Sequence, residues 1–397
     1  MVRREIWTSG DMSDTGADTV RAQQRLAELR QTYPLPAAWT AATATDDDDL
    51  LGRADIGSLS LYMVGVVARR RANTASGANA ASGANVTRQA DTASPSVALG
   101  SACACETYPV DRAYFELLER ISVLEARHSS TPLCVRALDG TELSQRDSLR
   151  VFPRDLQPER QRLALSNGVA LHTTWADACA AALSELVERD RVLRAWQGQC
   201  AKTAVSTDGS LAAARLQSHY SVRAYELGTP DSADSADSAV AADGAQAQAR
   251  RVVGFFLFPH APDHPFVYGF AAATQLANAL ARAETEALQR LAFLWGEPLP
   301  QHTPKPTPAP DYHQDYYLYP PNHAHILRWL EGDHALEPRR SRQRANAAIY
   351  DGECTQFIDL TPESLRGRLS VAKAVSTHAR RLRFGALRDE AVPHPIA

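Results

Sequence analysis

The pattern Glu-x-x-Glu-Arg occurs twice in this chain, each time within a run whose apolar residues have helical spacing. It reads Glu116-Leu-Leu-Glu119-Arg120 in the first run and Glu185-Leu-Val-Glu188-Arg189 in the second. Residues three apart lie on one helical face, so each pattern places two carboxylates along one edge of its helix. Two such edges facing each other concentrate four acidic groups, which cations must neutralise. The repeat therefore predicts a cation site between two helices, and Mg²⁺ with a nucleotide fits because this ion shares carboxylates with phosphates.

The rest of the sequence predicts a mixed fold of helices and strands. Helical spacing marks four runs, residues 17–30, 112–127, 174–197 and 275–295. Apolar runs rich in β-branched or aromatic residues predict strands at 57–67 and 252–258. Proline alternates with other residues from Pro304 to Pro310, which favours an extended connector. We therefore expect an α+β fold.

Two low-complexity segments interrupt these elements. Residues 72–95 are small and polar, and an Asp-Ser-Ala repeat from Asp231 extends to about residue 250. Both have too little apolar surface to offset the entropy cost of ordering the chain. We expect flexible insertions at both places.

Composition limits the class of protein more than it limits the function. The 397 residues carry a formal charge of −4, which gives no broad electrostatic reason to expect nucleic acid binding. No apolar run is long enough for a membrane span, and the first residues lack the apolar core of a signal peptide. We expect a globular cytoplasmic protein whose six scattered cysteines are reduced.

Three segments of the chain carry a family resemblance. The second Glu-x-x-Glu-Arg follows a Ser166-Asn167-Gly168 turn and closes with Asp190, and this stretch closely resembles the hallmark of the YcaO family. The first pattern, within 112–122, is similar to an earlier helix of that family. A third run contains Glu286-Ala-Leu-Gln289-Arg290, which looks like the family helix that ends in Glu-x-x-Gln. The order of the three motifs is that of the family.

The resemblance implies one large YcaO-type α+β domain over residues 97–397, preceded by an N-terminal part, residues 1–96. It also implies roles for individual residues. Glu116, Glu119, Glu185 and Glu188 would hold Mg²⁺ ions that bridge the phosphates of ATP. The nucleotide would be bound by Ser166, Asn167, Arg120, Arg189, Glu286 and Gln289. The bland alternative is that the acids pair with nearby arginines on helix surfaces and that the turn is ordinary. Glu284 is expected to face solvent.

One expected basic residue is missing. The family commonly carries a Gly-Lys-Gly element about fifteen residues before its first Glu-x-x-Glu-Arg helix. Counting back from Glu116 leads to Ser101-Ala102-Cys103, so the glycine-flanked lysine is absent. This departure removes one expected phosphate contact.

The C-terminus is the second feature that points to a function. The chain ends Pro393-His394-Pro395-Ile-Ala397, and azoline-forming YcaO enzymes often end in a similar proline-rich tail. Proline reduces the entropy lost when a tail occupies a groove. By resemblance, Pro393 and Pro395 would align the tail at the active site, and the terminal carboxylate of Ala397 would assist proton transfer. The alternative is a frayed terminus.

The reaction implied by the resemblance is ATP-dependent cyclodehydration of Cys, Ser or Thr in a ribosomally made precursor peptide. The family's azoline enzymes usually work with a leader-peptide-binding partner, so we expect a separate partner protein. The involvement of an azoline oxidase and the formation of a homodimer stay open. Three other readings also stay open. In the first, the chain is a YcaO enzyme that forms a thioamide or an amidine. In the second, it is a nucleotide- or peptide-binding scaffold without turnover, and in the third it is a structural protein whose acidic pairs are merely solvated.

Overall fold

The computed structural model describes most of the chain. The described residues are 15–41, 50–71, 97–153, 155, 158, 160–228, 250–332, 355–385 and 392–396. The insertion expected at 72–95, nearly all of the acidic repeat from Asp231 and the terminal Ala397 lie outside them.

The first of the three larger antiparallel sheets in the described residues is built around a central strand. Its strands are β1 (Trp39–Ala41), β2 (Leu50–Ile56), β3 (Leu59–Arg70) and β4 (Val97–Ala104). β1 and β2 both pair with β3, and β4 pairs with the opposite edge of β3 over Tyr62–Arg69. Helices α1 (Thr15–Thr32) and α2 (Val110–Arg127) pack on this sheet around one apolar core. The strands on either side of residue 96 therefore share one sheet and one core.

The second sheet collects strands from distant parts of the sequence. It contains β5 (Leu133–Arg136), β6 (Glu142–Arg146), β8 (Val169–His172), β13 (Thr355–Asp359) and β14 (Ser370–Ser376). The order is β6-β5-β13-β14-β8, so β8 is an edge strand. The long helix α4 (Trp175–Trp196) packs on β8 and β14, and the short helix α3 (Ser148–Val151) lies nearby in sequence.

The third sheet is covered on both faces. It contains β9 (Lys202–Val205), β10 (Tyr220–Leu227), β11 (Arg251–Pro259) and β12 (Val267–Ala273) in the order β12-β11-β10-β9. Side chains alternate across β11, so Val253 and Phe255 join the core of helix α6 (Leu276–Leu294), whereas Val252 and Phe256 join that of α4. Burial on both faces explains the unbroken apolar run that predicted this strand.

The remaining elements are small. They are β7 (Gln161–Leu163) paired with β15 (Arg383–Gly385), α5 (Leu211–Arg215), α7 (Pro310–Leu318), α8 (His323–Leu330) and the short 3-10 turns η1 (Pro320–Asn322) and η3 (Glu363–Leu365). α7 begins at Pro310, where the expected extended connector ends.

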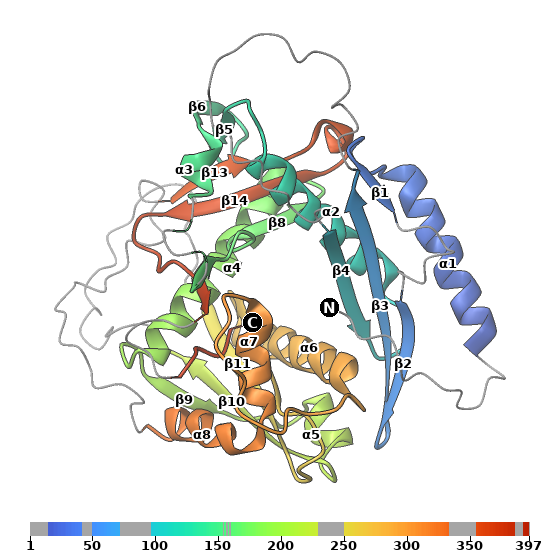
Figure 1. Cartoon of the computed structure of the whole chain (residues 1–397), viewed down its shortest axis with the longest axis vertical. Coiled ribbons are helices and arrows are strands. Elements are labelled where there is room, and N and C mark those ends of the chain that lie inside the picture. The colour runs from blue at the N-terminus through green and yellow to red at the C-terminus, as the bar shows by residue number, and fades with distance from the viewer. Residues whose placement is uncertain are drawn as a thin grey trace.

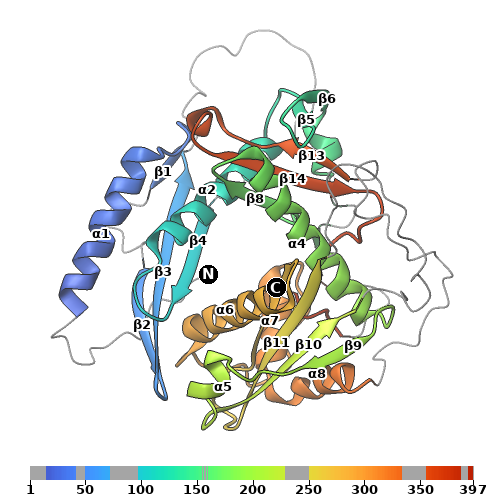
Figure 2. The same cartoon turned by 180° about the vertical axis from the view of Figure 1, so that it is seen from behind.

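The three sheets enclose a central space. Each contributes an edge strand that is followed along the chain by a helix, giving the pairs β4–α2, β8–α4 and β12–α6. Figures 1 and 2 show α2, α4 and α6 on the inner side of this arrangement. The predicted α+β class and the helices expected at 112–127, 174–197 and 275–295 are confirmed. None of the described helices is long and apolar enough to cross a membrane.

Candidate functional site

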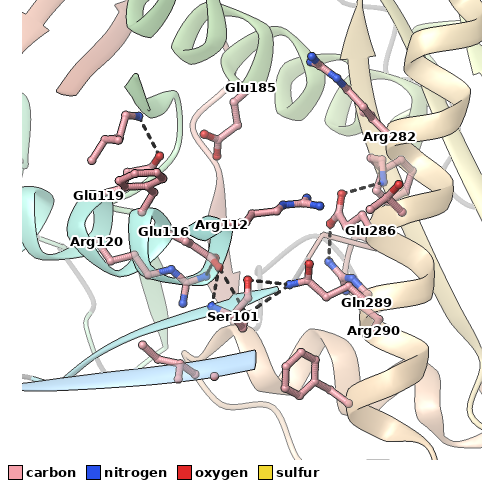
Figure 3. Close-up of a pocket in the computed structure, with 18 of the residues that line it drawn as sticks. Ser101, Arg112, Glu116, Glu119, Arg120, Glu185, Arg282, Glu286, Gln289 and Arg290 are labelled. Atoms are coloured by element: carbon pink, nitrogen blue, oxygen red, sulfur yellow. Dashed lines mark hydrogen bonds and ion pairs between the residues drawn. The ribbon is translucent and has the colours of Figure 1, made fainter. Parts of the chain in front are cut away.

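A cavity of about 1440 Å³ lies between α2, α4, α6 and the first sheet. Its polar wall is made by side chains from the three helices (Figure 3). Among the lining residues are Arg112, Glu116, Glu119, Arg120, Glu185, Glu188, Arg189, Arg282, Glu286, Gln289 and Arg290. The three helices thus bring one repeated pattern, Glu-x-x-Glu/Gln-Arg, to one cavity.

The first glutamate of each pattern is held by the edge strand that precedes its own helix. The Ser101 N–H of β4 donates to Glu116 at 2.7 Å, and the Phe270 N–H of β12 donates to Glu286 at 3.1 Å. The Val169 N–H of β8 hydrogen-bonds Glu185 and also donates to the Ser166 carbonyl at 3.1 Å. An unpaired N–H on a sheet edge needs an acceptor, and these carboxylates supply one.

The second member of each pattern reaches the strand of the next unit. Glu119 of α2 accepts the Leu171 N–H of β8 at 3.0 Å, and Glu188 of α4 accepts the Ala272 N–H of β12. The cycle is completed by Gln289 of α6, whose amide donates to the Ser101 carbonyl of β4 at 3.3 Å. A carboxylate cannot donate, so this position requires an amide. We call Glu116, Glu119, Glu185, Glu188, Glu286 and Gln289 the acidic ring.

Glycine allows strand and helix to approach closely enough for these bonds. A Cβ on Gly100 would lie 2.0 Å from the Ala113 carbonyl oxygen of α2. A Cβ on Gly269 would lie 2.2 Å from the Ala283 carbonyl oxygen of α6. No larger residue fits at either place without moving the helix, so each glycine sets the distance that the following residue's N–H must span.

Three carboxyl groups of the acidic ring are harder to ionise than free carboxyl groups. Burial raises the pKa of Glu119 to about 8, and the charges of Glu185 and Glu116 add to the rise. Burial also raises the pKa values of Glu185 and Glu188, with Arg189 opposing both shifts. A cation placed among these carboxylates would favour their ionised forms.

The arginines of the cavity fall into two groups. Arg120 and Arg290 pair with Glu116 and Glu286, each four residues earlier, at 2.6 and 3.1 Å, and Arg189 pairs with Glu188 at 3.3 Å. Within the described ranges, the Nη1 atom of Arg189 is buried without a hydrogen-bond partner.

Two further arginines have no ion pair or hydrogen bond with any described residue. They are Arg112 and Arg282, each four residues before the first glutamate of its pattern. Figure 3 shows Arg112 extending from α2 into the cavity. These unpaired guanidinium groups have the charge and geometry to bind phosphate oxygens.

The donor set fits Mg²⁺ held jointly with phosphates. No group of three or more His, Cys, Asp or Glu in the described part of the chain is arranged to hold a metal ion alone. Mg²⁺ commonly takes only one or two carboxylates and completes its coordination with phosphate oxygens and water. The residues present therefore match a metal–polyphosphate complex better than a metal bound by protein alone.

A family model described as YcaO cyclodehydratase, ATP- and Mg²⁺-binding, matches residues 148–378. The chain belongs to the YcaO family. The matched range contains α4 and α6, whereas α2, which completes the acidic ring, lies before it. ATP and Mg²⁺, the cofactors that the motifs predict, are those of this family.

Solved structures with similar architecture are distant in sequence. The YcaO protein of Methanopyrus kandleri bound with AMPPCP and Mg²⁺ is 14% identical, with a TM-score of 0.49 and coverage of 91% of this chain and 90% of that one. The E. coli microcin synthetase McbBCD complex gives 12% identity, a TM-score of 0.45 and coverage of 85% and 90%. A heterocyclase in complex with substrate and cofactor is 17% identical, with a TM-score of 0.41 and coverage of 63% of this chain and 33% of that one. A search among curated proteins found no match.

The structure brings most of the residues proposed from the YcaO motifs to one cavity. Those that line it are Glu116, Glu119, Arg120, Glu185, Glu188, Arg189, Glu286 and Gln289. Ser166 and Asn167 do not line it. Their turn is instead held by the buried Lys373 of β14, whose ammonium donates to the Leu165 and Asn167 carbonyls at 2.9 and 2.7 Å.

Glu284 corrects one expectation. It is only partly exposed, and it accepts the Ala212 N–H at 2.7 Å and the Ser210 hydroxyl at 3.0 Å, so that it caps the short helix α5. Helix spacing predicted correctly that Glu284 leaves the face of Glu286, but it carries no information about the neighbouring loop. Sequence reasoning also missed Arg112 and Arg282. Their shared spacing of four residues before a ring glutamate is the signal that would have found them.

Pro393 and Pro395 lie in a buried C-terminal segment, Val392–Ile396, rather than in a frayed end. This segment does not line the cavity; burial lowers the pKa of His394, and the charge of Arg189 adds a minor contribution.

Proposed function

We propose that this YcaO protein is an ATP- and Mg²⁺-dependent cyclodehydratase that converts Cys, Ser or Thr of a ribosomally made precursor peptide into thiazoline or oxazoline. The acidic ring carries the proposal. It gathers five carboxylates and several arginines around one cavity, and three of the carboxylates have raised pKa values in the absence of a cation. Gathering so many carboxylates in one cavity is unfavourable unless the cavity receives a cation.

In the proposed reaction the thiol or hydroxyl of the peptide attacks the preceding amide carbonyl carbon. ATP supplies the phosphoryl group that converts the resulting oxyanion into a leaving group. Departure of phosphate, with loss of the amide proton, leaves the C=N bond of the azoline ring. An amide oxygen is a poor leaving group by itself, which is why phosphoryl transfer is needed.

Each part of the site has a proposed task in this reaction. Glu116, Glu119, Glu185 and Glu188 would hold Mg²⁺, and Glu286 and Gln289 would complete the nucleotide site from α6. Arg189, with its buried unpaired Nη1, and Arg120 would contact phosphate oxygens. Fixed charges in a largely buried site stabilise the charge that develops during phosphoryl transfer.

The tail and the partners complete the proposal. Pro393 and Pro395 would align the tail, so that the carboxylate of Ala397 could exchange a proton with the reacting amide. A separate leader-peptide-binding protein would deliver the precursor, because the reaction needs the peptide to be positioned against the nucleotide. Ser166 and Asn167 would contribute only if the nucleotide extends beyond the described cavity.

The test combines nucleotide binding with peptide mass. Mg²⁺-dependent binding of ATP is measured first, and then phosphate release and peptide mass are followed with a Cys/Ser/Thr-rich precursor and its leader-binding partner. Loss of one water per phosphate released supports cyclodehydration. Exchange of oxygen for sulfur with added sulfide identifies thioamide formation, and binding without mass change identifies a scaffold. Absence of Mg²⁺-dependent binding refutes the nucleotide site.

A further inference from the structure

Two buried histidines, His313 and His394, hold the tail segment Val392–Ile396 in place. His313 of α7 is fully buried, and His394, between the two prolines of the tail, is 1% exposed. The centroids of their rings are 4.3 Å apart. Both side chains carry polar nitrogens into the core, so each nitrogen needs a partner.

The hydrogen bonds of His313 fix its tautomer. The Gly385 N–H of β15 donates to Nε2 of His313 at 3.0 Å, so Nε2 carries no hydrogen. Nδ1 of His313 must then be protonated, and it donates to the carbonyl of His394 at 2.9 Å. One neutral imidazole thus ties β15 to the tail.

The second ring repeats the arrangement in the opposite direction. Nε2 of His394 donates to the Arg383 carbonyl of β15 at 2.7 Å, which leaves Nδ1 to accept the Ile396 N–H at 3.4 Å. The Tyr317 hydroxyl, one turn after His313, donates to the Pro393 carbonyl. Burial lowers the pKa of His313 to about 4 and that of His394 to about 3, so both rings are neutral at pH 7.

The same helix connects this lock to the cavity. Gln314, next to His313, lines the cavity. The ring of Tyr317 lies 6.1 Å from that of Tyr268, and the Arg290 guanidinium lies over Tyr268 at 4.8 Å. Helix α7 therefore contacts the tail through His313 and Tyr317 and the wall of the cavity through Gln314.

We propose that His313 and His394 are a positioning pair that sets where the tail segment Val392–Ile396 lies relative to the nucleotide site. The inference rests on the proposed function, since positioning matters only if the chain's end takes part in the reaction on the peptide. Neither histidine touches the reacting atoms in this proposal. Their role is to hold Pro393 and Pro395 in one place while the nucleotide binds independently.

The test compares two substitutions at His394. His394→Gln keeps an amide that can donate to the Arg383 carbonyl, whereas His394→Leu has a similar volume and no donor. Hydrogen exchange of the C-terminal peptide reports whether the tail remains seated. We expect fast exchange in His394→Leu, a fall of about a hundredfold in kcat for peptide cyclisation, and an unchanged Kd for ATP, because a small misplacement far from the chemistry costs about this much. His394→Gln should retain most of the slow hydrogen exchange of the tail and most of the kcat for peptide cyclisation.

Tyr317→Phe removes only the hydrogen bond to the Pro393 carbonyl. It is the variant to measure if His394→Leu does not fold. Slow exchange in both His394→Leu and Tyr317→Phe would overturn the lock. Fast exchange with normal cyclisation would overturn the positioning role. A wild-type chain that seats its tail but never changes the mass of a peptide would instead refute the proposed reaction, so the two failures are distinguishable.

Discussion

Replacing Glu119 by glutamine should stabilise the metal-free protein and weaken its binding of Mg²⁺ and ATP. Glu119 accepts the Leu171 N–H at 3.0 Å, and the amide oxygen of glutamine can accept the same N–H. The hydrogen bond is therefore kept, and the side chain loses only its ability to ionise. Burial, together with the charges of Glu185 and Glu116, raises the pKa of Glu119 from 4.5 to about 8.

The size of the effect follows from proton linkage. Between pH 4.5 and about pH 8 the folded chain holds a proton on Glu119 that the unfolded chain has lost, so stability falls as pH rises through this range. At pH 7 the gap is about 2.5 pH units, and each unit is worth about 1.36 kcal/mol. Glu119→Gln avoids this cost and should raise the free energy of unfolding by up to about 3 kcal/mol at pH 7.

Urea unfolding at pH 7 without Mg²⁺ measures the increase in the free energy of unfolding. Titration with Mg²⁺ and ATP measures the loss of binding affinity. Glu119→Leu is the matched control, because it removes the acceptor as well and leaves the Leu171 N–H unpaired, at a cost of about 1–3 kcal/mol. A glutamine variant less stable than the wild-type chain would refute the electrostatic reasoning. A variant that binds Mg²⁺ and ATP normally would refute the metal role of Glu119.

Three further predictions concern the same site. The affinity for Mg²⁺ and ATP should increase as pH rises towards 8, by up to about tenfold per pH unit for each proton displaced, and calorimetric titrations in buffers of different ionisation enthalpy would count the protons released. Arg112→Gln should raise the Kd for ATP about tenfold or more, as loss of a hydrogen bond to a charged group costs about 1.5–3 kcal/mol, whereas Arg127→Gln, outside the cavity on the same helix, should not. Lys373→Met should lower the free energy of unfolding by about 2 kcal/mol or more in urea, because two carbonyls lose their donor.

Each of these predictions has a contrary outcome. An affinity for Mg²⁺ and ATP that does not change with pH would mean that Glu119 is already ionised before the ion binds. Equal Kd values for the Arg112 and Arg127 variants would remove Arg112 from the nucleotide site. A Lys373→Met variant as stable as the wild-type chain would show that the two hydrogen bonds do not outweigh the cost of burying the ammonium.

The helices and the ring glutamates were predictable because they depend on local spacing. Apolar residues at helical intervals locate α2, α4 and α6, and a three-residue interval places Glu116 beside Glu119 on one face. The closure of the ring was not predictable. Glu119 bonds Leu171, 52 residues away, and nothing in either residue type specifies that pairing.

The turn at Ser166 and Asn167 shows the limit of a motif. The sequence identifies a turn with exposed polar groups, but the side of the sheet that it faces depends on which strand lies beside β8. That strand is β14, and the ammonium of its Lys373 donates hydrogen bonds to carbonyl groups of the turn. Because residues 165 and 373 are 208 positions apart, only the folded chain reveals the contact.

The hydrogen bonds of the acidic ring also bear on how the three sheets are held together. β4, β8 and β12 are edge strands, and their N–H groups that face the cavity have no neighbouring strand among the described residues to accept them. Glu116, Glu119 and Glu286 accept N–H groups on these three edges, and Glu119 does so from α2 to β8 of another sheet. Substitutions that remove these acceptors would leave N–H groups unpaired inside the cavity, so the residues that form the site also join the sheets that surround it.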